Sequence, residues 1–487
     1  MKPPVKTIKE AAKKWRQEEI SPEEIYYSCR WFITFLIFKS AGWMLIVAVV
    51  KGLALIQLIF PEIAAATAAL SYGRLSAAAS TILIYGFALQ GLLAVAFYSS
   101  AVFGKTKIQH SLLIYGALIL WNIGVLTGAI GALLGDTTGY EWFELPRYTG
   151  MILSVAAALF AVGLTTILAT RAEETIHPSI WFWTILVYSI FLTIVTSQLF
   201  FVALPVSGVS QLLIHIWLKN ILFNICLCGG VIGAVFYALS ELKFNLYSRR
   251  IALVAFFSLM IAGGYGNISP SMPLPKWVYE MNSSASLLMI IPLLAALLNT
   301  GLTLFYKKKS AENKSIPYPL HYFSTALISA AFFVICAVSM FSINISRIIE
   351  FSIFSTGQDF LLICAVLFVF IGFSEIALPM LHNKSEPRGS SVQMWLIIGG
   401  GFTLAVSFLT GGFIQGANFY DYREKFIDAI NSIKPFIFTG SLAIVIIISG
   451  LLLFFYRSGK IVFQSIIIKI NELRELNMGE EKDEKMI

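Results

Sequence analysis

Long apolar runs separated by short polar links fill most of this chain of 487 residues. The runs are roughly 15 to 30 residues long, and a helix needs about 20 largely apolar residues to cross a bilayer. Strands of a membrane barrel would be shorter, about 10 residues, with alternating apolar and polar positions. The pattern therefore predicts an all-α polytopic membrane protein, in which every span satisfies its own backbone hydrogen bonds.

Twelve of these runs are predicted to be transmembrane helices. In chain order they are Trp31–Phe60, Ala77–Val102, Ser111–Leu134, Met151–Thr170, Ile180–Leu204, Leu212–Ala238, Ile251–Tyr265, Ser286–Tyr306, Tyr322–Ile343, Phe360–Leu381, Gln393–Gly412 and Phe436–Phe455.

Charged stretches flank this membrane domain, which covers residues 31–457. Residues 1–30 are predicted to be a cytoplasmic tail with one short surface helix that Ser21 caps, and residues 458–487 a second charged cytoplasmic tail. With the N-terminus inside, the inner segments hold 25 Lys and Arg residues and the outer links hold seven. Because cytoplasmic loops carry the excess of basic residues, both termini are predicted to be cytoplasmic.

Composition agrees with this class, since 57% of the residues are hydrophobic and only 13% are charged. The net charge of +8 follows from the topology and from contact with anionic membrane lipid, so no nucleic-acid partner is expected. The sequence has no phosphate-binding glycine loop, no G-x-S-x-G and no H-E-x-x-H motif. Polar residues inside the spans are therefore the candidates for function.

The sixth apolar segment carries two such residues, Lys219 and Asn220, well inside its length. A lysine and an amide at that depth are costly, so they indicate a polar cavity or a paired partner.

Seven motifs, in the expected order, resemble the central subunit of the cbb-type (C-family) cytochrome c oxidases, which is subunit I of the heme-copper oxidase superfamily. They are L-S-Y-G-R-L at 70–75, L-G-D-T-T-G-Y-E at 134–141, His177 with Trp181 and Phe182, A-L-P-V-S at 203–207, P-L-P-K-W at 273–277, G-G-F-I-Q-G at 411–416, and residues 426–435 before the last span. The resemblance covers nearly the whole chain. It implies the twelve-helix subunit I fold, a place in the bacterial inner membrane, and a respiratory complex as the setting.

The family holds two hemes and one copper with six histidines, and this sequence lacks them at the matching positions. Ala79 stands at the heme position of the second helix and Asn220 at the copper position of the sixth, while Gly357 and Asp359 stand near the H-x-H pair of the tenth. The pair on the seventh helix falls within residues 265–270, which contain no histidine. Imidazole suits heme iron and copper because it is a neutral, directional ligand.

A shift in alignment does not restore the ligands, because no histidine lies between His215 and His321 or between His321 and His382. His215 is five positions before Asn220, about 140° around a helix. His110 and His177, like His321 and His382, fall at span ends predicted to be cytoplasmic. The sequence therefore predicts no bound heme or copper, no metal ligand and no catalytic residue.

Lys219 and Asp359 fall at comparable depth on the sixth and tenth segments, which leaves two interpretations open. They form an ion pair across the former cofactor cavity, or Lys219 extends to the interface while Asp359 is a carboxylate at a helix N-terminus.

Three functions remain. The first, which the loss of every ligand favours, is a cofactor-less and non-catalytic structural or coupling subunit of a respiratory membrane complex. Its partners would be other membrane subunits of that complex and a cytochrome c. The second is a catalytic terminal oxidase or nitric oxide reductase subunit that binds heme b and copper through unusual ligands. The third is an ion or proton transporter that reuses the cavity.

Overall fold

The computed structural model describes residues 20–60, 68–109, 111–310, 317–340, 342–382, 389–421 and 425–484, with only the backbone described at 307–310 and 471–484. Most of the predicted N-terminal tail and His110 lie outside this part of the chain.

Helices account for nearly all of the described residues. The α-helices are α2 (Pro22–Ile59), α3 (Tyr72–Thr81), α4 (Gln90–Gly104), α5 (Ser111–Leu134), α6 (Arg147–Ala169), α7 (Pro178–Gln198), α8 (Val209–Asn220), α9 (Gly229–Glu241), α10 (Arg249–Ala262), α11 (Lys276–Ser286), α12 (Ile290–Ser310), α13 (Tyr318–Ser339), α14 (Ile343–Ile349), α15 (Phe354–His382), α16 (Ser391–Tyr420), α17 (Phe426–Asn431) and α18 (Lys434–Glu484). Short 3₁₀ or π-helical stretches are η1 (Ala68–Leu70), η2 (Ile82–Leu89), η3 (Leu199–Ala203), η4 (Ile221–Cys228) and η5 (Leu287–Met289).

Eleven helical stretches of the described chain are long and apolar enough to cross a membrane, and they coincide with eleven of the twelve predicted segments. The exception is the seventh, where α10 has 14 residues. At 1.5 Å per residue it is about 21 Å long, short of the roughly 30 Å hydrocarbon core. The pair Gly263 and Gly264 follows its last residue, and the backbone then runs without regular structure to α11.

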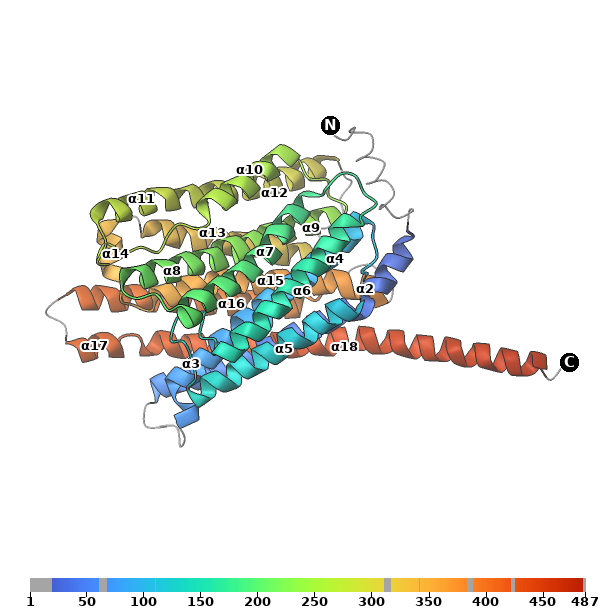
Figure 1. Ribbon diagram of the computed structural model, residues 1–487, viewed down its shortest axis with the longest axis horizontal. Helices are drawn as coiled ribbons and strands as arrows, with labels where there is room; N and C mark the ends of the chain where they lie inside the picture. Colours follow the sequence, from blue (N-terminus) through green and yellow to red (C-terminus); the bar gives the residue numbers. More distant parts are fainter. Residues whose placement is uncertain are drawn as a thin grey trace.

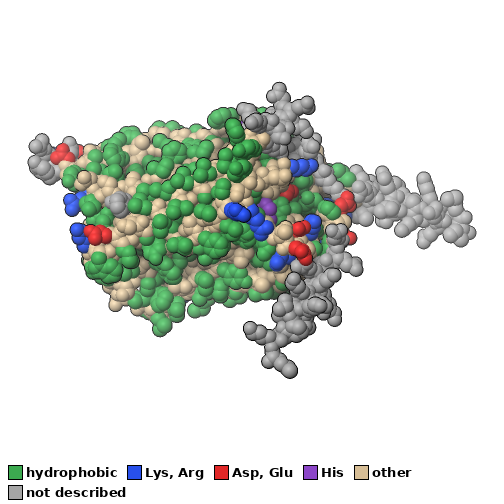
Figure 2. Space-filling model, turned by 90° about the horizontal axis from the view of Figure 1, so that it is seen from above, with side chains coloured by type: hydrophobic (Ala, Val, Ile, Leu, Met, Phe, Trp, Pro, Cys, Tyr) green, Lys and Arg blue, Asp and Glu red, His purple; other side chains and the backbone are tan. Residues whose placement is uncertain are grey.

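The surface agrees with a membrane protein. The long helices run roughly side by side, and α18 extends beyond the others at one end (Figure 1). Hydrophobic side chains cover the middle of the face seen in Figure 2, and the charged side chains gather near its two ends. This distribution is the one expected when lipid surrounds the middle of a bundle and water its ends.

Three spans form the centre of the bundle: Tyr72–Gly104, Val209–Glu241 and Phe354–His382. Their most apolar windows are 94%, 94% and 100% buried within the protein, against 56% or less for the others. Helices that are hydrophobic all round belong in such central positions. The first two contain the π-helical stretches η2 and η4, a distortion that is frequent at functional sites. These three spans carry the positions singled out in the sequence.

Both ends of the membrane domain continue as helix. The Ser21 side chain caps α2 by accepting a hydrogen bond from the Glu24 amide at 3.4 Å, but this helix is not a short surface one, because it runs unbroken into the first span. In the same way α18 continues past residue 458 to Glu484. The Lys469 ammonium lies 5.4 Å from the Tyr27 ring centroid, so the start of α2 lies beside the extension of α18 at one end of the bundle.

Candidate functional site

The structure brings Lys219 and Asp359 together near one end of the central spans. The ammonium Nζ of Lys219 lies 3.0 Å from Asp359 Oδ2 and 3.1 Å from Glu141 Oε2. The Lys219 and Asp359 side chains are 14% and 6% exposed, whereas that of Glu141 is 54% exposed. One lysine is therefore held between a buried carboxylate on α15 and a half-exposed carboxylate from the loop between α5 and α6.

Aromatic rings form the walls of this charge cluster. The Lys219 ammonium lies 5.7 Å from the Phe223 ring centroid and 6.0 Å from that of Trp142. These two rings pack against each other at 5.2 Å. A cation facing aromatic rings within about 6 Å is stabilised by their quadrupoles, so the walls favour the charged form of the lysine.

The loop that supplies Glu141 is fixed through its backbone. The Nε2–H group of His215 donates to the Glu141 carbonyl at 3.0 Å, and the Tyr85 hydroxyl donates to the Trp142 carbonyl at 3.1 Å. The Tyr140 ring stacks on the Phe201 ring of η3, with the ring centroids 4.0 Å apart. Trp142 has φ +68°, a left-handed conformation that costs free energy in a bulky residue and persists where surrounding contacts impose it.

The same loop contains Glu144, which lies outside the spans. Its carboxylate accepts a hydrogen bond from the Ser80 hydroxyl. Burial raises the pKa of Glu144 above its ordinary value, and the hydrogen bond from Ser80 opposes that shift.

Asn220 holds a loop. Its amide Nδ2 donates to the carbonyls of Gly264 and Gly266 at 3.3 and 3.0 Å, and its Oδ1 accepts from Asn267 Nδ2 at 2.7 Å. One turn later Asn224 Nδ2 donates to the Gly263 carbonyl at 3.1 Å. Backbone without regular structure is tolerated at membrane depth only where its polar groups find partners, and these two amides provide them after α10 ends. This hydrogen bonding explains an amide at position 220.

The other two former ligand positions offer no donor group. Ala79 is fully buried on α3 with only a methyl side chain. At Gly357 a Cβ atom would lie 2.5 Å from the backbone nitrogen of Leu409, so α16 occupies the space that a larger side chain would need. A backbone atom of a packed helix cannot move aside as a flexible side chain can.

His177 and His382 form hydrogen bonds away from the former ligand positions. His177 accepts a hydrogen bond from Ser179 through Nδ1 at 2.7 Å and reaches Ser240 with Nε2 at 2.8 Å. His382 contacts Thr34 and Ser465 at 2.8 and 2.9 Å. Each therefore bonds to hydroxyl groups at the ends of spans.

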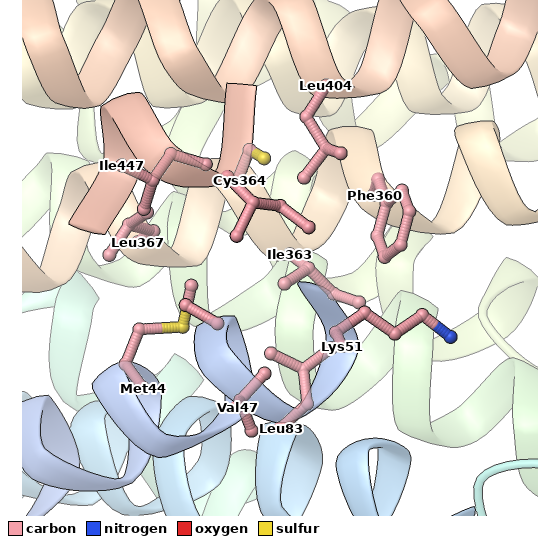
Figure 3. Close-up of a pocket in the computed structure, with 12 residues that line it drawn as sticks. Met44, Val47, Lys51, Leu83, Phe360, Ile363, Cys364, Leu367, Leu404 and Ile447 are labelled. Atoms are coloured by element: carbon pink, nitrogen blue, oxygen red, sulfur yellow. The ribbon is translucent and has the colours of Figure 1, made fainter. Parts of the chain in front are cut away.

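A small cavity lies between α2 and α15 (Figure 3). Apolar side chains from α2, η2, α15, α16 and α18 line it, together with Lys51. Its volume of about 40 Å³ leaves room for a few water molecules and costs only about 1 kcal/mol. Between the span that carries Ala79 and the span that carries Asp359, the rings of Phe87 and Phe370 pack edge to face at 5.6 Å.

Heme and copper are the cofactors that the fold family implies, and the side chains present do not fit them. A methyl group, a fully hydrogen-bonded amide, a glycine enclosed by backbone and an aspartate paired with lysine stand at the matched positions. Among the described residues, no group of three or more His, Cys, Asp or Glu side chains could hold a metal ion. The donor set lacks the neutral imidazoles with which this family holds both metals.

Comparison with known proteins decides the family. The family model of cytochrome c and quinol oxidase polypeptide I matches residues 32–446. The chain belongs to this family.

Individual relatives are distant. A cytochrome c oxidase subunit 1 homolog of Agrobacterium tumefaciens (strain T37) is 25% identical over 286 residues, which cover 55% of this chain and 52% of that protein. The cbb3-type cytochrome c oxidase subunit CcoN1 of Stutzerimonas stutzeri is 23% identical over 247 residues, 48% of this chain and 51% of that protein. The chain thus spans about half the length of the curated relatives it matches.

The similarity in fold covers more of the chain than the similarity in sequence does. A cryo-EM structure of a heme-copper terminal oxidase dimer superposes with a TM-score of 0.63 at 14% identity, covering 89% of this chain and 84% of that one. The all-helical fold of the heme-copper oxidases is therefore shared.

Sequence reasoning missed Glu141 as a member of the charge cluster. It lies in the motif 134–141 but belongs to a link between spans, 78 residues from Lys219. A carboxylate in an interspan link gives no periodic signal, because only the path of the loop decides whether it reaches the bundle.

Proposed function

We propose that this chain is a non-catalytic member of the oxidase subunit I family, which serves as a structural or coupling subunit of a respiratory membrane complex and binds neither heme nor copper. The observation that carries the proposal is the use of the former ligand positions for internal bonding. Asp359 neutralises Lys219, and Asn220 ties down the loop after α10. Side chains committed in this way are not available to a metal.

The proposed topology has twelve crossings, with α10 as the seventh and both termini cytoplasmic in a bacterial inner membrane. Its support is the excess of basic residues on one side and the adjacency of α2 and the α18 extension at one end of the bundle. An even number of crossings returns the chain to the side from which it started.

Spectroscopy of the purified chain tests the proposal. We expect no reduced-minus-oxidised heme band in the pyridine hemochrome assay and substoichiometric copper by elemental analysis, measured on protein expressed under conditions that load an active oxidase of the same host. Stoichiometric heme b or one copper per chain would contradict the proposal and favour an oxidase or reductase with unusual ligands.

A transport assay addresses the remaining alternative. The proposal predicts that liposomes containing the chain show no more proton or ion flux than liposomes with a Lys219→Met/Asp359→Leu variant. Flux that depends on these two residues would instead favour a transporter that uses the charge cluster.

A further inference from the structure

The Lys219 ammonium contacts two carboxylates, and one of them, that of Glu141, can move away into solvent. Asp359 is 6% exposed on the central helix α15, so it is a permanent counterion. Glu141 meets the same ammonium at 3.1 Å, but its side chain is 54% exposed. Half-exposed ion pairs contribute little stability, so solvent competes well for this carboxylate.

Exchange at this position does not require the loop to open. The backbone carbonyls of Glu141 and Trp142 are held by His215 and Tyr85, and the neighbouring Tyr140 ring is stacked. Rotation about the Glu141 side-chain bonds is enough to move its carboxylate into water. What remains is the space that this carboxylate occupied, a recess with the Lys219 ammonium at its base and the rings of Trp142 and Phe223 beside the ammonium.

We propose that this recess binds a small carboxylate anion, and that the Glu141 side chain is its exchangeable internal occupant. The carboxylate of Glu141 itself defines the group that fits: planar, singly charged and within hydrogen-bonding distance of Lys219. The aromatic rings beside the ammonium suit the short apolar part of an acetate-like ligand. This assignment does not depend on the proposed role in a respiratory complex.

An internal occupant lowers the apparent affinity for an external one in proportion to the fraction of time that the site is free. If Glu141 occupies Lys219 for about five-sixths of the time, its removal tightens external binding about sixfold. The variant Glu141→Gln removes the internal charge while keeping the shape of the side chain.

Acetate is the probe, added to the purified full-length protein in detergent at constant ionic strength, with chloride as the balancing anion. Binding is followed by saturation-transfer NMR of the acetate methyl group and by the shift of the unfolding temperature with acetate concentration. We expect the apparent dissociation constant of Glu141→Gln to be about sixfold lower than that of the wild type. Asp136→Asn, a matched carboxylate-to-amide change in the same loop, should leave it unchanged.

Removal of the ammonium completes the test. Because Lys219→Met alone leaves Asp359 unpaired, the variant is Glu141→Gln/Lys219→Met/Asp359→Leu, which should give no acetate signal. The proposal is overturned if Glu141→Gln binds acetate no better than the wild type, if the triple variant still binds it, or if chloride competes as well as acetate does.

Discussion

At the residue scale, a charge inside the membrane is tolerated only with its partner. Lys219 and Asp359 come from spans that are far apart in the chain, and neither is exposed enough for water to replace the other. Removing one member of a buried pair leaves an uncompensated charge, which costs about 3–5 kcal/mol, whereas replacing both with apolar groups is close to neutral. The pair therefore behaves as a single unit.

Lys219→Met is expected to destabilise the protein more than Lys219→Met combined with Asp359→Leu, because only the single variant leaves a buried carboxylate unpaired. The measurement is the free energy of unfolding in detergent for both single variants and the double variant. Glu141→Gln serves as the control, with an expected loss of less than about 1 kcal/mol since its carboxylate is half-exposed. Additive losses in the cycle would contradict the pairing.

His177 lies just before α7 and links stability to pH. Burial lowers its pKa from 6.5 to about 4, and its unprotonated Nδ1 caps the helix by accepting a hydrogen bond from the Ser179 amide. Between these pH values the unfolded chain binds more protons than the folded one, so stability falls as the pH drops from about 6.5 to 4.

The expected loss across that range is on the order of 2 kcal/mol, read from unfolding at a series of pH values. His177→Asn keeps a side-chain cap without a titrating group, so it should flatten this part of the profile. An unchanged profile in His177→Asn would show that other groups cause the pH dependence.

At the element scale, close packing of α15 against α16 decides what the former ligand positions can hold. Gly357 meets the backbone of α16 directly, whereas Gly399 on α16 has no atom within 4 Å of an added Cβ. Glycine is therefore required at the first position and only tolerated at the second.

Gly357→Ala is expected to destabilise the protein by about 1–3 kcal/mol, because a methyl group would force two packed helices apart. Gly399→Ala should be neutral or stabilising by up to about 1 kcal/mol, since alanine favours a helix. Thermal unfolding of the two variants side by side makes the comparison, and equal effects would refute the close contact.

At the scale of the whole molecule, the proposed role as a subunit requires contacts with other chains. The most apolar windows of the outer spans are 39–56% buried within the chain, which leaves about half of each for lipid or for neighbouring subunits. We expect gentle detergent extraction to yield a complex with other respiratory membrane proteins, including a cytochrome c, identified by mass spectrometry. Isolation as a lone monomer in several mild detergents would count against the proposed role.

Sequence alone determined the class of protein and most of its spans. Apolar runs of bilayer length allow only helices, so eleven predicted segments coincide with helical stretches able to cross a membrane. The motifs identified the family, and the residue types at 79, 220, 357 and 359 already excluded imidazole ligands there. These conclusions rest on the length of the apolar runs, on composition and on the residue type at each position, all of which can be read directly from the sequence.

Only the tertiary structure decided how the polar residues are paired. In the structure α10 ends after 14 residues, and the loop that follows it is hydrogen-bonded to Asn220. Glu141, which belongs to a link between spans, contacts Lys219. The helices α2 and α18 also continue through the boundaries expected at residues 30 and 458. These contacts of Asn220 and Lys219 join residues that are 44 to 140 positions apart, so they depend on how the helices pack and where the loops run. Hydrophobic periodicity along the chain predicts neither of these.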